Sequence, residues 1–251
     1  MGQKARLFFA ADVTAPWPSA LPNGRLIKPQ FRHMTLAFLG MQDRHDVMEK
    51  IAPPEWVLPP TGVFTKWVFL PEETPRVVAA VPDFLEGEQS LLEYQKKLAD
   101  GDNFMPHVSI SRDPFDKEAW EKFPCKIPFF ISAIALYKSL GHSNYEKLWE
   151  KKLLAPFEEI EHTADIAYKI RAENFSQLAL HAALALSFSY PAFIGYLDRT
   201  VHVNSVQEIV ELLNEWIAEI DSAEGIGLKA VSCHATISGR EILEWTMIVD
   251  V

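Results

Sequence analysis

Two short motifs in the chain place a hydroxyl residue two positions after a histidine. His33 opens the run HMTLAFLG, which contains Thr35, and His107 opens HVSISR, which contains Ser109. Residues i and i+2 of a β-strand project from the same face, so each motif would set an imidazole beside a hydroxyl. The intervening apolar residues would face a core, namely Met34, Leu36 and Phe38 in the first motif and Val108 and Ile110 in the second. We therefore expect two strands that line one cleft with two imidazoles and two hydroxyls.

This set of groups suits the opening of a cyclic phosphodiester. One imidazole would take a proton from an attacking water and the other would protonate the departing ribose oxygen. The ordinary histidine pKa of about 6.5 allows both roles at neutral pH, and each transfer is worth roughly 10²–10⁴-fold in rate. The hydroxyls of Thr35 and Ser109 would bind phosphate oxygens as charge develops. Arg112 follows the second motif where it would contact phosphate, although a solvated arginine at a strand end explains it equally well.

A third copy of the pattern shows how little one motif proves. The chain has eight histidines, and His234 is followed by Thr236. At typical serine and threonine frequencies about one such pattern arises by chance, and a partly buried structural histidine explains a single copy better. The third copy lies in a segment of different composition, so we interpret it as coincidence. His33 and His107 are more specific, because both begin apolar strands within one unit.

The charge distribution divides the chain into two expected domains. A length of 251 residues favours two domains. Residues 1–155 contain 19 basic and 19 acidic residues, whereas residues 156–251 contain 5 and 15, so the net charge of −10 lies entirely in the second part. An acidic unit is a poor surface for an RNA backbone; a metal ion or a basic protein partner suits it better.

Composition also bears on location. There is no run of about 18 apolar residues that would span a membrane, and the apolar stretch near the N-terminus is too short for a signal peptide. Cys125 and Cys233 match no zinc or redox pattern. We therefore expect a cytoplasmic protein with reduced thiols and no membrane contact.

Apolar patterning predicts an α+β fold in both parts. In residues 1–155 we expect strands over 6–13, 33–40, 63–70, 76–81, 107–112, 127–138 and 145–152, and helices over 43–51, 86–98 and 117–123. In residues 156–251 we expect two short strands within 157–173, a helix over 176–188, strands over 201–203, 228–232 and 242–251, and a helix opened by Ser205. Glu208 lies three positions after Ser205, which is the pattern of a capping box.

The first part resembles the RNA 2′,3′-cyclic phosphodiesterases, the two-histidine phosphoesterases once called 2′-5′ RNA ligases. The runs RLFFAADV, HMTLAFLG, MPHVSISR, AIALYKS and NYEKL follow the family's order. The resemblance implies a bilobal fold of two β-sheets with helices outside and the cleft between them. It also implies that His33 donates a proton to the leaving 3′-oxygen and that His107 accepts one, giving a 2′-phosphate without a metal or other cofactor. Ser109 stands where the family usually has threonine.

The second part resembles archease, a protein that assists the RNA ligase RtcB. The resemblance rests on FEEIEHTADIAYKIRAENFSQLALHAALAL, on LKAVSCHATI and on the final IVDV. It implies that Asp165 and Asp250, together with Val251, hold Ca²⁺ or Mg²⁺, which prefer oxygen ligands, and that Lys229 has a functional role. From spacing alone, ordinary surface acids explain the two aspartates better. The stretch between the second helix and LKAV is shorter than in archeases, so the unit is shortened.

Three functions follow as hypotheses. The leading one is an enzyme that opens RNA 2′,3′-cyclic phosphate ends, fused to an archease-like module that serves an RtcB-type ligase in tRNA processing. The second is a non-catalytic accessory that binds RNA ends for the ligase. The third keeps the enzyme but gives it small cyclic nucleotides as substrates. The sequence does not identify the natural RNA, nor the direction of the reaction in the cell.

Overall fold

The computed structural model describes residues 4–99, 104–141, 143–161, 165–233 and 242–251. It divides into two compact units, Met1–Leu154 and Ala155–Val251, a division one residue from the boundary expected from the charges. Within the described ranges, no helix is long and apolar enough to cross a membrane.

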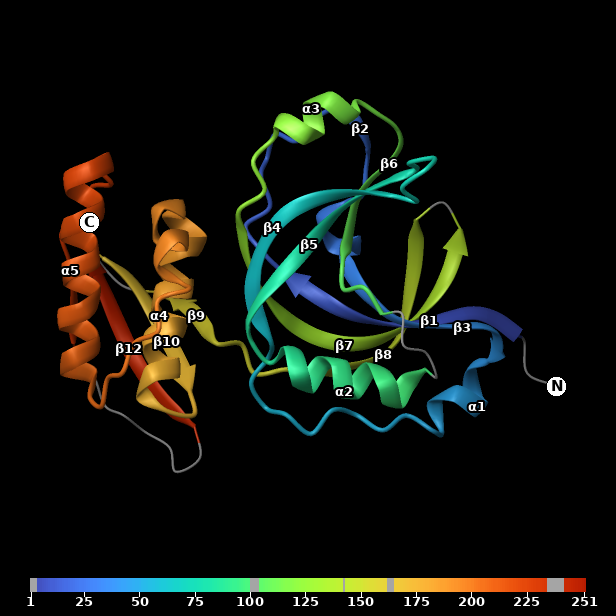
Figure 1. Cartoon of the computed structure of the whole chain (residues 1–251). Coiled ribbons are helices and arrows are strands. Elements are labelled where there is room, and N and C mark those ends of the chain that lie inside the picture. Colours follow the sequence, from blue (N-terminus) through green and yellow to red (C-terminus); the bar gives the residue numbers. More distant parts are fainter. Residues whose placement is uncertain (1–3, 100–103, 142, 162–164, 234–241) are drawn as a thin grey trace. The chain divides into compact units, whose positions relative to one another are not determined.

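The N-terminal unit consists of strands with three short helices and one 3-10 turn (Figure 1). Its strands are β1 (Lys4–Thr14), β2 (Gly24–Leu26), β3 (His33–Asp43), β4 (Thr61–Leu70), β5 (Val77–Glu86), β6 (Val108–Phe115), β7 (Ile127–Gly141) and β8 (Asn144–Lys152). Its helices are η1 (Pro29–Phe31), α1 (Arg44–Met48), α2 (Glu88–Leu98) and α3 (Lys117–Lys122). The α+β prediction is confirmed, and the predicted strands and helices are all present with ends shifted by a few residues.

The strands form two groups, β8-β7-β1-β3 and β4-β5-β6-β2, and all of their described pairings are antiparallel. Two short pairings join the groups: β4 pairs with β7 over four residues, and β3 pairs with β6 only at Met34 and Val108. The expected two sheets are therefore present as two strand groups of one continuous sheet.

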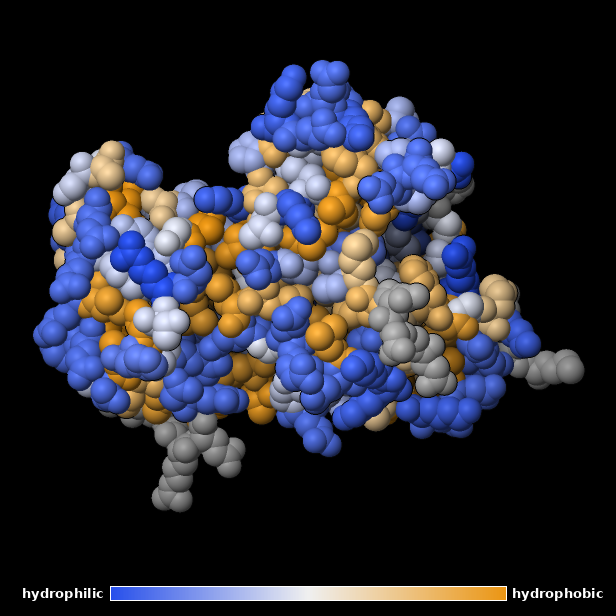
Figure 2. Space-filling view, in the orientation of Figure 1, coloured by the Kyte–Doolittle hydropathy of each residue, from blue (hydrophilic) through white to orange (hydrophobic). Residues whose placement is uncertain are grey.

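The core of this unit lies between the two strand groups. Alternate residues of β1, including Leu7, Phe9 and Ala11, are buried in it, together with Met34 of β3 and Val108 of β6. The other face of β1 carries Phe8, Ala10 and Asp12. In Figure 2, hydrophilic side chains cover α3, whereas its Trp120 is fully buried beneath them. The alternation of β1 thus separates a core face from a second face.

Strand β2 was not expected, because Asn23 and Gly24 predict a turn. Instead, Gly24–Leu26 pairs with β6, with Arg25 opposite Arg112. A Cβ atom at Gly24 would collide with the hydroxyl of Ser111, so a larger residue at this position would have to displace the Ser111 side chain. The strand is short and its three residues are exposed, which explains why it shows no apolar pattern.

The C-terminal unit is a four-stranded antiparallel sheet with two long helices. Its elements are β9 (Phe157–Ile160), β10 (Ile166–Ala172), α4 (Phe175–Ser189), η2 (Pro191–Tyr196), α5 (Val206–Glu224), β11 (Ala230–Cys233) and β12 (Leu243–Asp250), with the strand order β11-β12-β10-β9. The hydroxyl of Ser205 accepts a hydrogen bond of 3.2 Å from the backbone N–H of Glu208, as the capping pattern predicts. The outer side of α5 is hydrophilic (Figure 2).

One predicted strand in this unit was wrong. Residues 201–203 have no regular secondary structure, although Val201 and Val203 are half-buried and His202 is exposed. The segment has the alternation of a strand, but within the described part of the chain no strand pairs with it. It connects η2 to the N-cap of α5 instead.

Candidate active site

The single pairing between β3 and β6 brings the two histidine motifs together. Met34 follows His33 and Val108 follows His107, and these two apolar residues are cross-strand partners with no exposed surface. His33 is the first residue of β3, as predicted. His107 lies immediately before β6, one residue outside the strand expected to begin there. Each imidazole is thus attached to a backbone that the core fixes in place.

The two histidines make matching hydrogen bonds. His33 Nδ1 lies 2.9 Å from the carbonyl oxygen of Phe31, and His107 Nδ1 lies 2.9 Å from that of Met105, in each case two residues earlier in the chain. A carbonyl oxygen only accepts, so each Nδ1 donates. The remaining nitrogen, Nε2, is then the atom that gains or loses a proton. In both rings the carbonyl leaves Nε2 as the nitrogen that can exchange a proton with a substrate or water.

One cavity of about 850 Å³ contains both histidines. Its lining includes all five residues that the sequence assigned to the phosphodiesterase site, His33, His107, Thr35, Ser109 and Arg112. The volume lies in the upper part of the ~300–1,000 Å³ range of small-molecule sites. The structure therefore places the five predicted residues around one space.

Three arginines give this cavity a positive character. Arg6 and Arg25 line it together with Arg112. The Nε atom of Arg112 is buried and, among the described residues, has no hydrogen-bond partner. A buried donor without a partner costs free energy, and an anionic phosphate would satisfy it with a charge-assisted bond. The arrangement favours a phosphate ligand beside the two histidines.

His33 lies in an aromatic surrounding. Its ring is stacked on Tyr137 at 5.6 Å between centroids, meets the edge of Tyr145 at 5.0 Å and lies 5.2 Å from Phe8. Burial by these rings is the main cause that lowers the pKa of His33 below its usual value, and the positive charges of Arg112 and His107 act in the same direction. In the free protein the His33 side chain therefore holds its proton less firmly than an exposed histidine.

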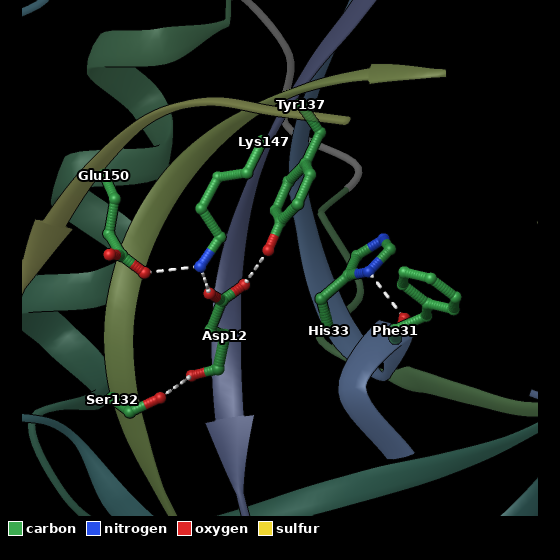
Figure 3. A network of polar contacts seen from close by, with 7 residues as sticks. All are labelled: Asp12, Phe31, His33, Ser132, Tyr137, Lys147 and Glu150. Carbon is green, nitrogen blue, oxygen red and sulfur yellow. Dashed lines mark hydrogen bonds and ion pairs between the residues drawn. The ribbon is translucent and has the colours of Figure 1, made fainter. Parts of the chain in front are cut away.

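The negative charge of Asp12 opposes this effect, and Figure 3 shows its carboxylate bonded to Tyr137 and Lys147. Asp12 is the cross-strand neighbour of His33. Its Oδ1 accepts a hydrogen bond of 2.6 Å from the Tyr137 hydroxyl, and its Oδ2 lies 2.8 Å from Lys147 Nζ. Lys147 also contacts Glu150. Together with the hydrogen bond to Phe31, the negative charge of Asp12 raises the pKa of His33 against the effect of burial.

Sequence reasoning missed the residues that surround the predicted five. A signal existed for Asp12, because it is a carboxylate inside the apolar run RLFFAADV. Tyr137 lies in the run AIALYKS but was not singled out, and no comparable signal marks Arg25, which lies on the unexpected strand β2. Phe38 was assigned to the core, and this was wrong: its side chain is 71% exposed and lines the cavity.

The residues predicted to bind a metal lie at one end of the C-terminal sheet. Asp165 precedes Ile166 and Asp250 follows Val249, and Ile166 and Val249 are cross-strand partners, so the two aspartates lie at neighbouring strand ends. The side chain of Lys229 lies at the same end of the sheet, beside Asp250. Its Nζ lies 3.5 Å from Asp250 Oδ1 and 2.7 Å from the backbone oxygen of Val251.

This donor set does not fit a cation as it stands. No group of three histidine, cysteine, aspartate or glutamate side chains that could hold a metal ion occurs in the part of the chain that the structure describes. An ammonium group beside Asp250 competes with a metal ion for the same oxygen. His162 and the motif from His234 to Thr236 lie outside the described residues. The metal site and the role of Lys229 stay predictions.

Comparisons with known proteins give only solved structures. No protein-family model matches the chain, and no curated protein does. Escherichia coli LigT bound to phosphate is 22% identical with a TM-score of 0.42, and the alignment covers 61% of this chain and 99% of LigT. The apo form of LigT is 18% identical with a TM-score of 0.44, and its alignment covers the same shares of the two chains. The protein TT0787 of Thermus thermophilus is 20% identical with a TM-score of 0.41, and the alignment covers 59% of this chain and 97% of TT0787. These values describe what the chain is similar to and do not assign it to a family.

Proposed function

We propose that the N-terminal unit hydrolyses 2′,3′-cyclic phosphate ends of RNA to 2′-phosphates. The observation that carries the proposal is the pair of histidines with matching Nδ1 bonds, both on a cavity that also holds two hydroxyls and an arginine with an unsatisfied donor. Two proton-transfer groups and several phosphate-binding groups are what this hydrolysis needs. The class of substrate, RNA, comes from the resemblance of the sequence motifs.

The reaction assigns a different role to each histidine. Nε2 of His107 removes a proton from water, whose oxygen attacks phosphorus. The bond between phosphorus and the 3′-oxygen breaks, and Nε2 of His33 protonates that oxygen. The products are a 3′-hydroxyl and a 2′-phosphate. His33 has then given one proton to the 3′-oxygen, and His107 has gained one proton from water. Exchange with water restores both imidazoles.

The phosphate-binding groups would act as charge builds up on the phosphorane oxygens. Thr35 on β3 and Ser109 on β6 line the cavity beside the histidines, and their hydroxyls donate to these oxygens. Arg112 adds a charge-assisted bond. Such preorganised donors stabilise the transition state more than the ground state.

The burial of His33 has a consequence for its role as the acid. An acid must be protonated when the substrate is bound, yet burial lowers the pKa of this group in the free protein. The bound cyclic phosphate is an anion, and a nearby anion favours the protonated imidazole. The negative charge of the bound substrate therefore raises the pKa of His33 and keeps its imidazole protonated.

The direct test uses an oligoribonucleotide with a 2′,3′-cyclic phosphate end. The wild-type protein is expected to convert it to a 2′-phosphate end, identified by mass and by chromatography against synthetic 2′-phosphate and 3′-phosphate standards. A product with a 3′-phosphate would reverse the assignment of the leaving oxygen. Absence of any conversion would refute the proposal and favour a protein that only binds RNA ends.

We further propose that the C-terminal unit contacts a basic protein surface rather than RNA. The observation that favours this is the charge, since all of the net −10 lies in residues 156–251 and an acidic surface repels a phosphate backbone. The resemblance to archease makes an RtcB-type RNA ligase the partner to test. We expect the ligase to co-purify with residues 1–251. About 0.5 M salt should weaken this association, because it screens exposed charges.

A further inference from the structure

Phe38 is a large apolar side chain that the fold places in the cavity instead of the core. It is 71% exposed, and it lines the same cavity as the two histidines. Its cross-strand partner on β1 is Phe8, with 6.1 Å between the ring centroids. Phe8 in turn contacts the ring of His33. Aromatic side chains therefore continue from His33 through Phe8 to the exposed ring of Phe38.

An irregularity in the strand pairing explains this position. Thr35 is opposite Ala10, but the next residue of β1 towards the N-terminus, Phe9, is opposite Ala37, so Leu36 is an extra residue on β3. Such a bulge shifts the alternation of side chains by one position. Without it, Phe38 would share a face with Met34 and be buried. The bulge turns Phe38 to the face that carries His33 and Thr35.

Arg6 lies farther along the same face of the sheet. It precedes Phe8 by two residues on β1, and its side chain lines the cavity. At about 3.3 Å per residue, Phe8 lies about 13 Å and Arg6 about 20 Å along the strand from Asp12, the neighbour of His33. On this face Phe8 lies between Arg6 and His33, and its ring contacts the imidazole. The Arg6 guanidinium is available to another phosphate of the same strand.

We propose that Phe38 and Arg6 form a subsite for the nucleotides on the 5′ side of the cyclic phosphate, with a base stacked on Phe38 and a backbone phosphate bound by Arg6. The inference rests on the proposed function and names its substrate more closely, as a single-stranded RNA end of at least two or three nucleotides. An exposed aromatic ring next to an arginine is the combination by which proteins bind single strands, since every base has a face that stacks. The occupant is RNA rather than an apolar ligand, because arginines line the cavity beside the ring.

The experiment compares kcat/KM for two substrates, a mononucleotide 2′,3′-cyclic phosphate and a trinucleotide that ends in the same cyclic nucleotide. We expect the wild-type protein to favour the trinucleotide by about 10-fold or more, the effect of stacking one base on an aromatic ring. Phe38→Ala should reduce this ratio by about 10-fold. Phe38→Trp should keep the ratio, because the indole offers a stacking face.

Arg6→Gln tests the phosphate contact separately. It should lower kcat/KM for the trinucleotide and reduce the slope of its logarithm against the logarithm of salt concentration by about 0.7, the value for one phosphate contact of a single strand.

Met48→Ala is the matched control for Phe38→Ala, since Met48 is an exposed apolar side chain of the same unit that does not line the cavity. This variant should keep the wild-type ratio.

The outcomes separate this inference from the proposed function. Equal kcat/KM for the two substrates, or an unchanged ratio in Phe38→Ala, overturns the subsite and leaves the cyclic phosphodiesterase in place. Turnover of neither substrate overturns both. A loss of the preference in Phe38→Ala that Phe38→Trp restores supports the stacked base.

Discussion

Met34 on β3 and Val108 on β6 are cross-strand partners, and neither has any exposed surface. They form the only pairing between these strands in the described residues, and each immediately follows a histidine of the candidate site. The two strand groups of the N-terminal unit thus meet at the residues that orient His33 and His107. The geometry of the site depends on the core through this pair.

Shortening Met34 should therefore affect both stability and activity. Met34→Ala removes a fully buried side chain, and such truncations cost about 2–5 kcal/mol, measurable by urea unfolding followed by tryptophan fluorescence. The cavity left behind lets β3 move relative to β6, so kcat should fall even under conditions where the variant is folded. Met34→Leu conserves the volume and should cost less than about 1.5 kcal/mol. Wild-type stability in Met34→Ala would contradict the packing described for this pair.

Replacing either histidine should abolish most of the activity without unfolding the protein. His33→Gln and His107→Gln each remove one proton-transfer group, and we expect kcat to fall by about 10²–10⁴-fold. The double variant should be little worse than the single ones, because the two groups act as a unit. Circular dichroism checks the fold. A variant that retains wild-type kcat would remove that histidine from the mechanism.

The pH dependence of kcat/KM should identify which histidine is the acid. Burial lowers the pKa of His33 in the free protein, and kcat/KM reports the groups of the free enzyme. If His33 donates the proton, activity should fall as the pH rises through a value below about 6.5, the ordinary histidine pKa. A rise of kcat/KM over the same range would make His33 the base and His107 the acid.

Asp12 should control the position of this pH limb. The charged groups that act on His33 are Asp12, which raises its pKa, and Arg112 and His107, which lower it. Asp12→Asn removes the negative charge, so the pKa of His33 and the alkaline limb of kcat/KM should move to lower pH. NMR titration of His33 gives the pKa directly. Glu146→Gln is the control, because Glu146 pairs with Lys138 and should leave the limb in place.

Chelators should leave the phosphodiesterase activity intact. The proposed proton transfers use only the imidazoles of His33 and His107, and their partners in catalysis are hydroxyls and an arginine. Hydrolysis of a cyclic-phosphate RNA in excess EDTA is therefore expected to proceed at the wild-type rate. Loss of activity that Mg²⁺ or Ca²⁺ restores would require a metal in the mechanism and would count against the two-histidine assignment.

The predicted cation site of the C-terminal unit can be tested through Lys229. Its ammonium group lies 3.5 Å from Asp250 Oδ1, where it competes with a cation. We expect calorimetric titration to find no Ca²⁺ binding in the wild type or in Asp250→Asn, and measurable binding in Lys229→Met. Equal affinity of the three proteins would mean that Asp250 is not a ligand.

The local elements of this fold could be predicted because their signals are local. The apolar runs that predict β1 and β3, and the capping residues Ser205 and Glu208, act within a few positions of each other, and the structure confirms both strands and the cap. The expected strand at 201–203 failed because a strand exists only if another strand pairs with it. Strand β2 was missed for the converse reason, since pairing with β6 forms it without an apolar pattern.

The sequence by itself determined the chemistry of the site, since the spacing of His33 with Thr35 and of His107 with Ser109 predicts which side chains share a face. It also determined that the acidic charge lies in a separate unit. Only the tertiary structure decided that Asp12, Tyr137, Arg6 and Arg25 join these residues, because strand pairing brings them to the site. It alone decided the position of Phe38 as well. The extra residue Leu36 in the register of β3 against β1 reverses the faces of the next side chains, including Phe38, until a second irregularity at Leu39. That register depends on the pairing of the strands.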